Sequence, residues 1–239
     1  MKRTVGSGFQ RSGFIPTPGR FVAIDVPAQS LIGVAYRGSF EEPKNVPGWA
    51  QSERYNVTAI VPPGSRQATV PLMLRAAADG AFQLAVHFER EERNVLLLTR
   101  SQPNAPLPPG LQRIEEDCTQ PREPQAQTPE LPRTEGGVMP ACFGMDNGRT
   151  FNSGGLPMER LASWLRPQVG RQVIDRTDLP GSYRLVLRYS RPDSGGQPTT
   201  DEYPEVTTAI REQLGLKLTP GRAPVNILVV DRFERPTED

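Results

Sequence analysis

Short runs of alternating hydrophobic and polar residues, and longer runs at helical spacing, give the clearest pattern along the chain. The alternating residues 54–60 and 182–187 predict half-buried strands, because successive side chains of a strand point to opposite faces. Residues 70–78 and 206–214 instead predict helices of about ten residues. Two strands are expected after each helix, at residues 82–86 and 94–98 and at residues 216–218 and 225–230.

Comparison of the chain with itself indicates an internal duplication. Residues 19–21 and 26–32 match residues 148–151 and 156–162. In both copies a short strand is expected to lead into a helix that begins at a proline, where the missing N–H costs no hydrogen bond. These patterns predict an α+β fold of two similar duplicated lobes, each with the order strand, helix, strand, helix, strand, strand. A chance resemblance between short strand–helix units is the alternative.

Residues 101–147 differ in composition from both predicted lobes. They are rich in Pro, Gln, Glu and Thr and poor in aliphatic residues, which is typical of an extended linker without a core of its own. A second surface loop is expected at residues 190–200. The predicted organisation is a flexible N-terminal segment at residues 1–13, lobe one at 14–100, the linker at 101–147 and lobe two at 148–239.

Composition and charge exclude several classes of partner. The chain has 26 Pro and 22 Gly among its 239 residues, which is typical of a loop-rich globular protein. Its 28 basic and 27 acidic residues give a net charge of +1, so there is no electrostatic basis for binding nucleic acid. The longest aliphatic runs, at residues 95–98 and 227–230, are too short to span a membrane. No apolar export segment is recognisable at the start.

The two cysteines, Cys118 and Cys142, flank the proline-rich part of the predicted linker. A disulfide between them would close a loop whose entropy is worth roughly 3 kcal/mol. Such a bond forms in an oxidising compartment, which means the periplasm, the cell surface or the medium. Two unrelated thiols in a cytosolic protein are the alternative. A zinc site is not supported, because two Cys and one His do not supply four ligands.

His87 is the only histidine, so any chemistry that depends on histidine is limited to one position. Alternation along the strand is expected to bury its hydrophobic neighbours and to place His87 on the opposite face, beside Gln83 and Glu89. The buried neighbours expected from this pattern are Phe82, Leu84, Val86 and Phe88. His87 could act as a general base oriented by Glu89. The favoured interpretation is an exposed polar pair on a strand.

Other catalytic motifs are missing from the sequence. It contains no glycine-rich phosphate loop, zinc-binding helix motif, nucleophile elbow or calcium loop, and no cofactor or metal is therefore predicted. The polar residues 173–181 are explained by a local turn in which Asp175, Thr177 and Asp178 bond nearby backbone N–H groups. Capture of a ligand by this loop is the alternative.

Several runs resemble the Solibacter-type family of uncharacterised proteins, which is abundant in acidobacterial genomes. They are residues 170–177, 179–183 and 214–218 and the ending at residues 229–238. The resemblance implies an exported protein with a domain of unknown function and a sensing or binding role outside the cytoplasm. Some members carry the domain behind a membrane metallopeptidase of the antibiotic-sensor type. This chain departs from the family pattern in lacking an export segment and an opening strand before Gly19, and in having Leu96 and Asp178 where an aromatic residue and a glycine are common.

These observations favour a noncatalytic binding or sensor module outside the cytoplasm, either periplasmic or secreted. Its ligand, an unknown small molecule or envelope protein, is expected in a groove between the two lobes. One alternative is a hydrolase of small esters, lactones or peptides that uses His87 and Glu89. Another is a structural envelope protein whose lobes pair through unpaired strand edges.

Overall fold

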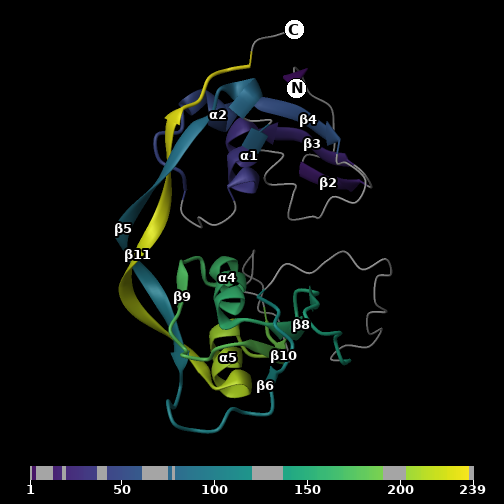
Figure 1. Ribbon diagram of the computed structural model, residues 1–239, viewed down its shortest axis with the longest axis vertical. Helices are drawn as coiled ribbons and strands as arrows, with labels where there is room; N and C mark the ends of the chain where they lie inside the picture. Colours follow the sequence, from purple (N-terminus) through teal and green to yellow (C-terminus); the bar gives the residue numbers. More distant parts are fainter. Residues whose placement is uncertain are drawn as a thin grey trace. The chain divides into compact units, whose positions relative to one another are not determined.

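The computed structural model describes residues 2–3, 13–17, 20–36, 42–60, 75–76, 79–119, 137–190 and 203–236 (Figure 1). These residues form two compact units, of which unit 1 comprises Met1–Glu92 and Pro224–Asp239 and unit 2 comprises Arg93–Ala223. The α+β class is confirmed, with more strands than helices. The units differ from the predicted lobes at 14–100 and 148–239, because the C-terminal segment packs with the N-terminal part of the chain.

Unit 1 contains a four-stranded antiparallel sheet. Its order is β1 (Lys2–Arg3), β4 (Arg54–Ile60), β3 (Arg20–Pro27) and β2 (Gly13–Thr17). β4 coincides with the strand predicted at residues 54–60. β2 precedes Gly19, so the expectation that the chain lacks an opening strand before Gly19 is wrong. β1 and β2 also show that the predicted flexible segment at residues 1–13 includes strand residues.

Two helices and an aromatic cluster complete unit 1. α1 (Ala28–Ala35) begins after Pro27 and buries residues at the spacing of one helical face, namely Ala28, Leu31, Ile32 and Ala35. α2 (Gly48–Ser52) follows Pro47. The Trp49 ring lies 4.8 Å from the Phe233 ring, and Phe233 lies 5.3 Å from Phe82. Phe233 thereby fixes the C-terminal segment to the core of unit 1.

Unit 2 contains a second four-stranded antiparallel sheet. Its order is β6 (Leu111–Ile114), β10 (Ser182–Arg188), β8 (Thr150–Leu156) and β7 (Gly144–Asp146). α4 (Met158–Val169) begins after Pro157, as expected, and α5 (Val206–Leu214) matches the helix predicted at residues 206–214. Both helices end at a glycine in the left-handed conformation, Gly170 and Gly215, each with a φ of 64°.

The core of unit 2 is formed by α4, α5 and the inner residues of β8 and β10. Trp164 on α4 stacks on Phe151 of β8 with a centroid distance of 4.2 Å. Asp146 accepts hydrogen bonds from Trp164 Nε1 at 3.0 Å and from the Tyr189 hydroxyl at 2.9 Å. This carboxylate therefore satisfies two polar groups at the edge of an otherwise apolar core.

Two long strands replace the four short ones that the hydrophobic pattern predicted. β5 (Ala85–Arg100) runs beside β11 (Leu216–Arg232) in the opposite direction, and β9 (Val173–Asp175) pairs with β5 in parallel (Figure 1). The boundary between the two units passes through both long strands. Phe88, which was expected to be buried, has 49% of its surface exposed.

The predicted linker at residues 101–147 contributes to unit 2. β6 and β7 lie within it and form both edges of the second sheet, and Leu111, Cys118 and Met139 are buried. The expectation of a segment without a core does not hold for these residues. Residues 120–136 and 191–202, which include most of the predicted loop at 190–200, lie outside the described residues.

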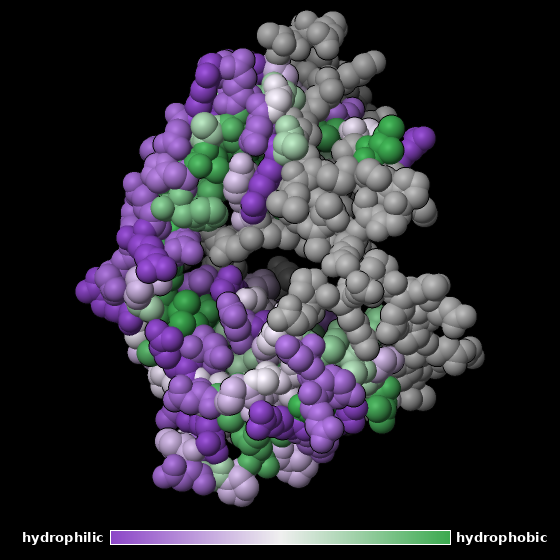
Figure 2. All heavy atoms as spheres, viewed as in Figure 1, coloured by the Kyte–Doolittle hydropathy of each residue, from purple (hydrophilic) through white to green (hydrophobic). Residues whose placement is uncertain are grey.

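In the face that Figure 2 shows, hydrophilic side chains cover much of the described surface and hydrophobic ones form small separate groups.

Candidate functional site

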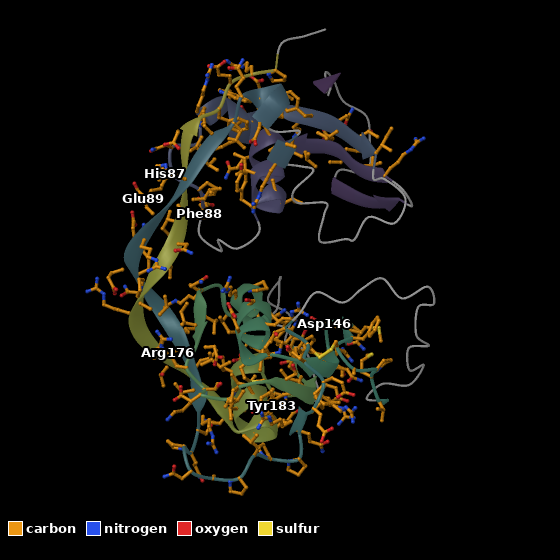
Figure 3. All side chains as sticks on the ribbon, viewed as in Figure 1. His87, Phe88, Glu89, Asp146, Arg176 and Tyr183 are labelled. Atoms are coloured by element: carbon orange, nitrogen blue, oxygen red, sulfur yellow. A yellow bond between two sulfur atoms is a disulfide. The ribbon has the colours of Figure 1, made fainter. Side chains whose placement is uncertain are left out.

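His87 lies in a cluster of charged side chains on β5 and β11. Its Nδ1 atom is 2.9 Å from both carboxylate oxygens of Asp231, and its Nε2 atom is 3.3 Å from Glu89 Oε1. His87 and Glu89 project from the same side of β5, while Phe88 between them points to the other side (Figure 3). The expected contact with Glu89 is therefore present, but the closer partner is Asp231 from the other end of the chain.

Lys44 adds a cation to this cluster. Its backbone N–H donates to Leu228 O at 2.8 Å, and its carbonyl accepts from Val230 N–H at 3.1 Å, so the segment is fixed beside β11. The Lys44 ammonium contacts Glu91 and lies 3.8 Å from Glu89 Oε2. The acidic side chains Glu89 and Glu91 on this part of β5 are thus compensated by His87 and Lys44.

The hydrogen bond with Asp231, followed by the one with Glu89, raises the pKa of His87 above its usual range. The charged imidazolium is therefore favoured, and both ring nitrogens contact carboxylates. A general base needs a free nitrogen lone pair next to its substrate. The arrangement supports an ion-pair cluster better than it supports proton abstraction.

Stability should depend on pH through His87. Because the folded state raises the pKa of His87, its stabilising contribution is fully present below the unfolded value of about 6.5 and is lost as pH rises through the folded value. We expect the stability difference between wild type and His87→Gln to shrink as pH increases from about 5.5 to about 8.5, that is, from about one unit below to about two units above the ordinary imidazole pKa of about 6.5. Denaturant unfolding across this range measures it.

The matched variant is Asp231→Asn, which keeps the imidazole but removes its main carboxylate partner. The pH-dependent difference should be smaller in that background, because the folded pKa of His87 moves toward its ordinary value. Parallel stability curves for wild type and His87→Gln at all pH values would show that folding does not raise the pKa of His87.

A separate cavity of about 280 Å³, the α4–α5 cavity, lies in unit 2 between the end of α4 and the start of α5. Its lining residues come from β5, from the end of α4 and the turn after it, and from the start of α5: Leu96, Gln168, Val169, Arg171, Glu205, Val206 and Thr207. The left-handed Gly170 ends α4 and directs the chain toward β9. This turn is fixed to β5 by a hydrogen bond from Leu96 N–H to Gln172 O at 2.9 Å.

The α4–α5 cavity combines an apolar lining with two opposite charges. Leu96, Val169 and Val206 supply the apolar surface, and Arg171 and Glu205 supply the charges. Glu205 is the N-cap residue of α5, but its side chain makes no capping hydrogen bond. Within the described part of the chain, no ion pair or side-chain hydrogen bond involves either Arg171 or Glu205. No described residue therefore competes with a ligand for either charged group.

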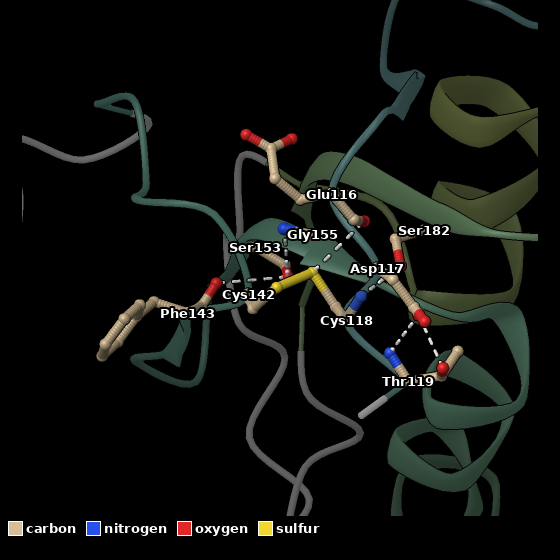
Figure 4. Close-up of a disulfide and its surroundings, with 9 residues drawn as sticks. All are labelled: Glu116, Asp117, Cys118, Thr119, Cys142, Phe143, Ser153, Gly155 and Ser182. Atoms are coloured by element: carbon tan, nitrogen blue, oxygen red, sulfur yellow. Dashed lines mark hydrogen bonds between the residues drawn. A yellow bond between two sulfur atoms is a disulfide. The ribbon is translucent and has the colours of Figure 1, made fainter. Parts of the chain in front are cut away.

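The disulfide between Cys118 and Cys142 is present, which confirms the predicted pairing (Figure 4). Cys118 is buried, and its N–H donates to Ser182 Oγ at 2.9 Å. Hydrogen bonds from the hydroxyl and N–H of Thr119 lower the pKa of Asp117. An open, polar cavity of about 500 Å³ lies beside this loop, with lining residues from Arg113 to Asp117 and at Gly181 and Ser182.

The polar loop that follows β9 has the local bonds expected of a turn. Asp175 Oδ1 accepts from Thr177 N–H at 2.9 Å, and Thr177 Oγ1 accepts from Leu179 N–H at 3.3 Å. The Tyr183 hydroxyl donates to Pro180 O at 3.3 Å, and the Arg176 N–H donates to Leu98 O at 2.8 Å. Figure 3 shows Arg176 and Tyr183 in unit 2. These bonds account for Asp175 and Thr177 without a ligand, whereas Asp178 has no side-chain hydrogen bond with a described residue.

A family described as "protein of unknown function (DUF3738)" matches residues 29–233. The chain belongs to the DUF3738 family. The prediction of a domain of unknown function is thereby confirmed. No curated protein and no solved structure matches the chain. The region matched by DUF3738 includes the His87 cluster, the disulfide and all residues that line the α4–α5 cavity.

The structure also tests this DUF3738 chain for metal sites and membrane segments. Among the described residues, no group of three or more His, Cys, Asp or Glu side chains is arranged to hold a metal ion. The described helices include none that is long and apolar enough to cross a membrane.

Four residues of these sites were not identified as candidates from the sequence. Asp231 and Lys44 reach His87 and its neighbours only through strand pairing between distant parts of the chain. Arg171 follows the glycine that ends α4, and Glu205 precedes the first residue of α5. Charged residues at two helix ends were the available signal for the cavity of this DUF3738 protein.

Proposed function

We propose that this DUF3738 protein is a noncatalytic binding or sensor module that takes up a small ligand in the α4–α5 cavity. The observation that supports this most directly is a pair of opposite charges, Arg171 and Glu205, beside the apolar lining of one cavity, neither of which has an ion pair or side-chain hydrogen bond with a described residue. Ligand pockets typically combine apolar surface with a few polar groups that orient the ligand. The volume of about 280 Å³ is at the small end of their usual range, which favours a small molecule.

The disulfide indicates an oxidising compartment, because thiols of cytosolic proteins are kept reduced. We therefore propose that the module works in the periplasm or after secretion. The location agrees with the role that the sequence resemblance implies.

We also propose that the two sheets arose by duplication, as the sequence predicts. Both four-stranded sheets pair two antiparallel strands with at least one helix between them in sequence: α1 and α2 lie between β3 and β4, and α4 and β9 lie between β8 and β10. Both pairs also contain a register shift, near Ala23 and near Tyr183. These shared features support a common origin of the two sheets.

Occupation of the cavity can be tested by blocking it. Thr207→Trp places a bulky ring at the cavity, whereas Glu212→Trp places the same ring at an exposed position of the same helix away from it. A thermal-shift screen of amino acids, short peptides, sugars and cell-wall fragments should find ligands that stabilise wild type and Glu212→Trp but not Thr207→Trp. Absence of any stabilising ligand, or equal stabilisation of all three proteins, would contradict the proposal.

The hydrolase alternative is favoured by one observation, the contact of Asp231 with His87 Nδ1, which resembles the orientation of a general base by a carboxylate. Turnover of an ester, lactone or peptide substrate that disappears in His87→Ala would support it. Undiminished turnover in that variant would exclude His87 as the base.

The alternative of a structural protein that pairs through strand edges predicts self-association, and sedimentation that shows only monomer at high concentration would exclude it.

A further inference from the structure

The charges at the α4–α5 cavity restrict the chemistry of its ligand, provided that the proposed function holds. Arg171 presents a planar fork of N–H donors that matches a carboxylate, and Glu205 presents acceptors that match an ammonium group. The two residues lie on different segments, one after α4 and one before α5. A ligand that contacts both needs an acidic and a basic group in the same molecule.

The two charges do not compensate each other within the protein. No ion pair joins Arg171 to Glu205 or to any other described residue, and Glu205 does not cap its own helix. This differs from the His87 cluster, in which every charged group has a partner of opposite sign. Both residues are exposed, so a singly charged ligand would leave one of the two groups solvated and would form only one of the two charge-assisted hydrogen bonds.

The remaining lining selects for an aliphatic group. Leu96, Val169 and Val206 form the apolar surface, and Val206 is buried in the core of unit 2. A small branched aliphatic chain gains free energy from contact with this surface, whereas a second charged group does not. Size, charge and apolar surface therefore point to one class of ligand.

We propose that the α4–α5 cavity binds a small zwitterion with an aliphatic side chain, an amino acid or a dipeptide. The carboxylate of the ligand contacts the Arg171 guanidinium, and its ammonium group contacts the Glu205 carboxylate. The aliphatic side chain lies against Leu96, Val169 and Val206. The inference rests on the proposed function and assigns its ligand class.

Calorimetric titration with matched probes tests the class. L-leucine and L-alanyl-L-leucine carry both charges, 4-methylpentanoate carries only the carboxylate, 3-methylbutylamine carries only the ammonium group, and 4-methylpentanamide is uncharged. We expect one of the two zwitterions to bind at least about tenfold more tightly than each of the other three probes, as the loss of one charge-assisted hydrogen bond implies.

Two variants assign the contacts. Arg171→Gln should weaken binding of the zwitterion and of 4-methylpentanoate about tenfold and leave 3-methylbutylamine unchanged. Glu205→Gln should weaken the zwitterion and 3-methylbutylamine and leave 4-methylpentanoate unchanged. Thermal unfolding of each variant shows whether it is folded. This measurement separates a loss of all binding caused by misfolding from the loss of a single contact.

The outcomes separate this inference from the proposed function. Equal affinity of the uncharged probe and the zwitterions, or equal effects of both variants on every probe, would overturn the ligand class. The ligand class would also be overturned if a wider screen found only other kinds of molecule that bind wild type and are blocked by Thr207→Trp. The proposed function would stand in that case. If no ligand of any kind is blocked by Thr207→Trp, both are overturned.

Discussion

Replacement of both cysteines by alanine should lower the free energy of unfolding by roughly 3 kcal/mol. Cys118 and Cys142 are separated by 24 residues in sequence, and their Cα atoms are 5.2 Å apart. The bond restricts the unfolded chain and fixes β7 and the residues before it to the sheet of unit 2. Urea unfolding monitored by the fluorescence of Trp164, which packs in unit 2, measures the change.

Reduction provides the control for this prediction. Wild type treated with dithiothreitol should lose as much stability as Cys118→Ala/Cys142→Ala, while the double variant should not respond to the reductant. A wild type that is equally stable in oxidised and reduced form would contradict the prediction.

The parts of the fold that the sequence predicted well are those in which local pattern and tertiary environment agree. β4 covers the predicted residues 54–60, and α5 covers the predicted residues 206–214. In α5 the buried residues Val206, Ala209, Ile210 and Leu214 occupy one helical face, so that the periodicity visible in the sequence is the periodicity of burial.

β5 and β11 could not be predicted from local pattern. The charged run at residues 89–93 and the Pro and Gly residues at 219–224 are typical of turns, yet both continue as strand. The two strands are hydrogen-bonded neighbours in one sheet, and this pairing overrides the local preference. At Gly221 a Cβ atom would lie 2.7 Å from the Leu97 side chain, so a glycine there permits close approach of the two strands.

The candidate sites were predictable only in part, for the same physical reason. The pairing of the two cysteines follows from their number and from the composition between them. The contact between His87 and Glu89 follows from the two-residue period of a strand. Asp231 reaches His87 only because β11 pairs with β5. Arg171 and Glu205 line the same cavity only because α4 packs beside α5. Contacts between distant segments depend on the tertiary fold, which one sequence does not reveal.

Replacement of Gly154 by alanine should destabilise unit 2 by about 3 kcal/mol or more, at the upper end of overpacking effects. Gly154 lies in β8, and a Cβ atom there would be 1.9 Å from Pro140 O and 2.4 Å from Met139 O. Both obstacles are backbone atoms, and neither can move by a change of side-chain rotamer. The segment before Cys142 would have to move away from β8, although the disulfide and the buried Met139 hold it there.

Gly144→Ala is the matched control, because Gly144 lies in β7, which pairs with β8. A Cβ atom at this position would meet its nearest neighbour, Asn152 O, at 3.5 Å, an ordinary contact. This variant should stay within about 0.5 kcal/mol of wild type in the same urea titration. Similar stabilities of the two variants would show that the segment at Met139 and Pro140 does not pass as close to β8 as the structure describes. A large loss confined to Gly154→Ala would show that close passage over β8 determines the stability of unit 2.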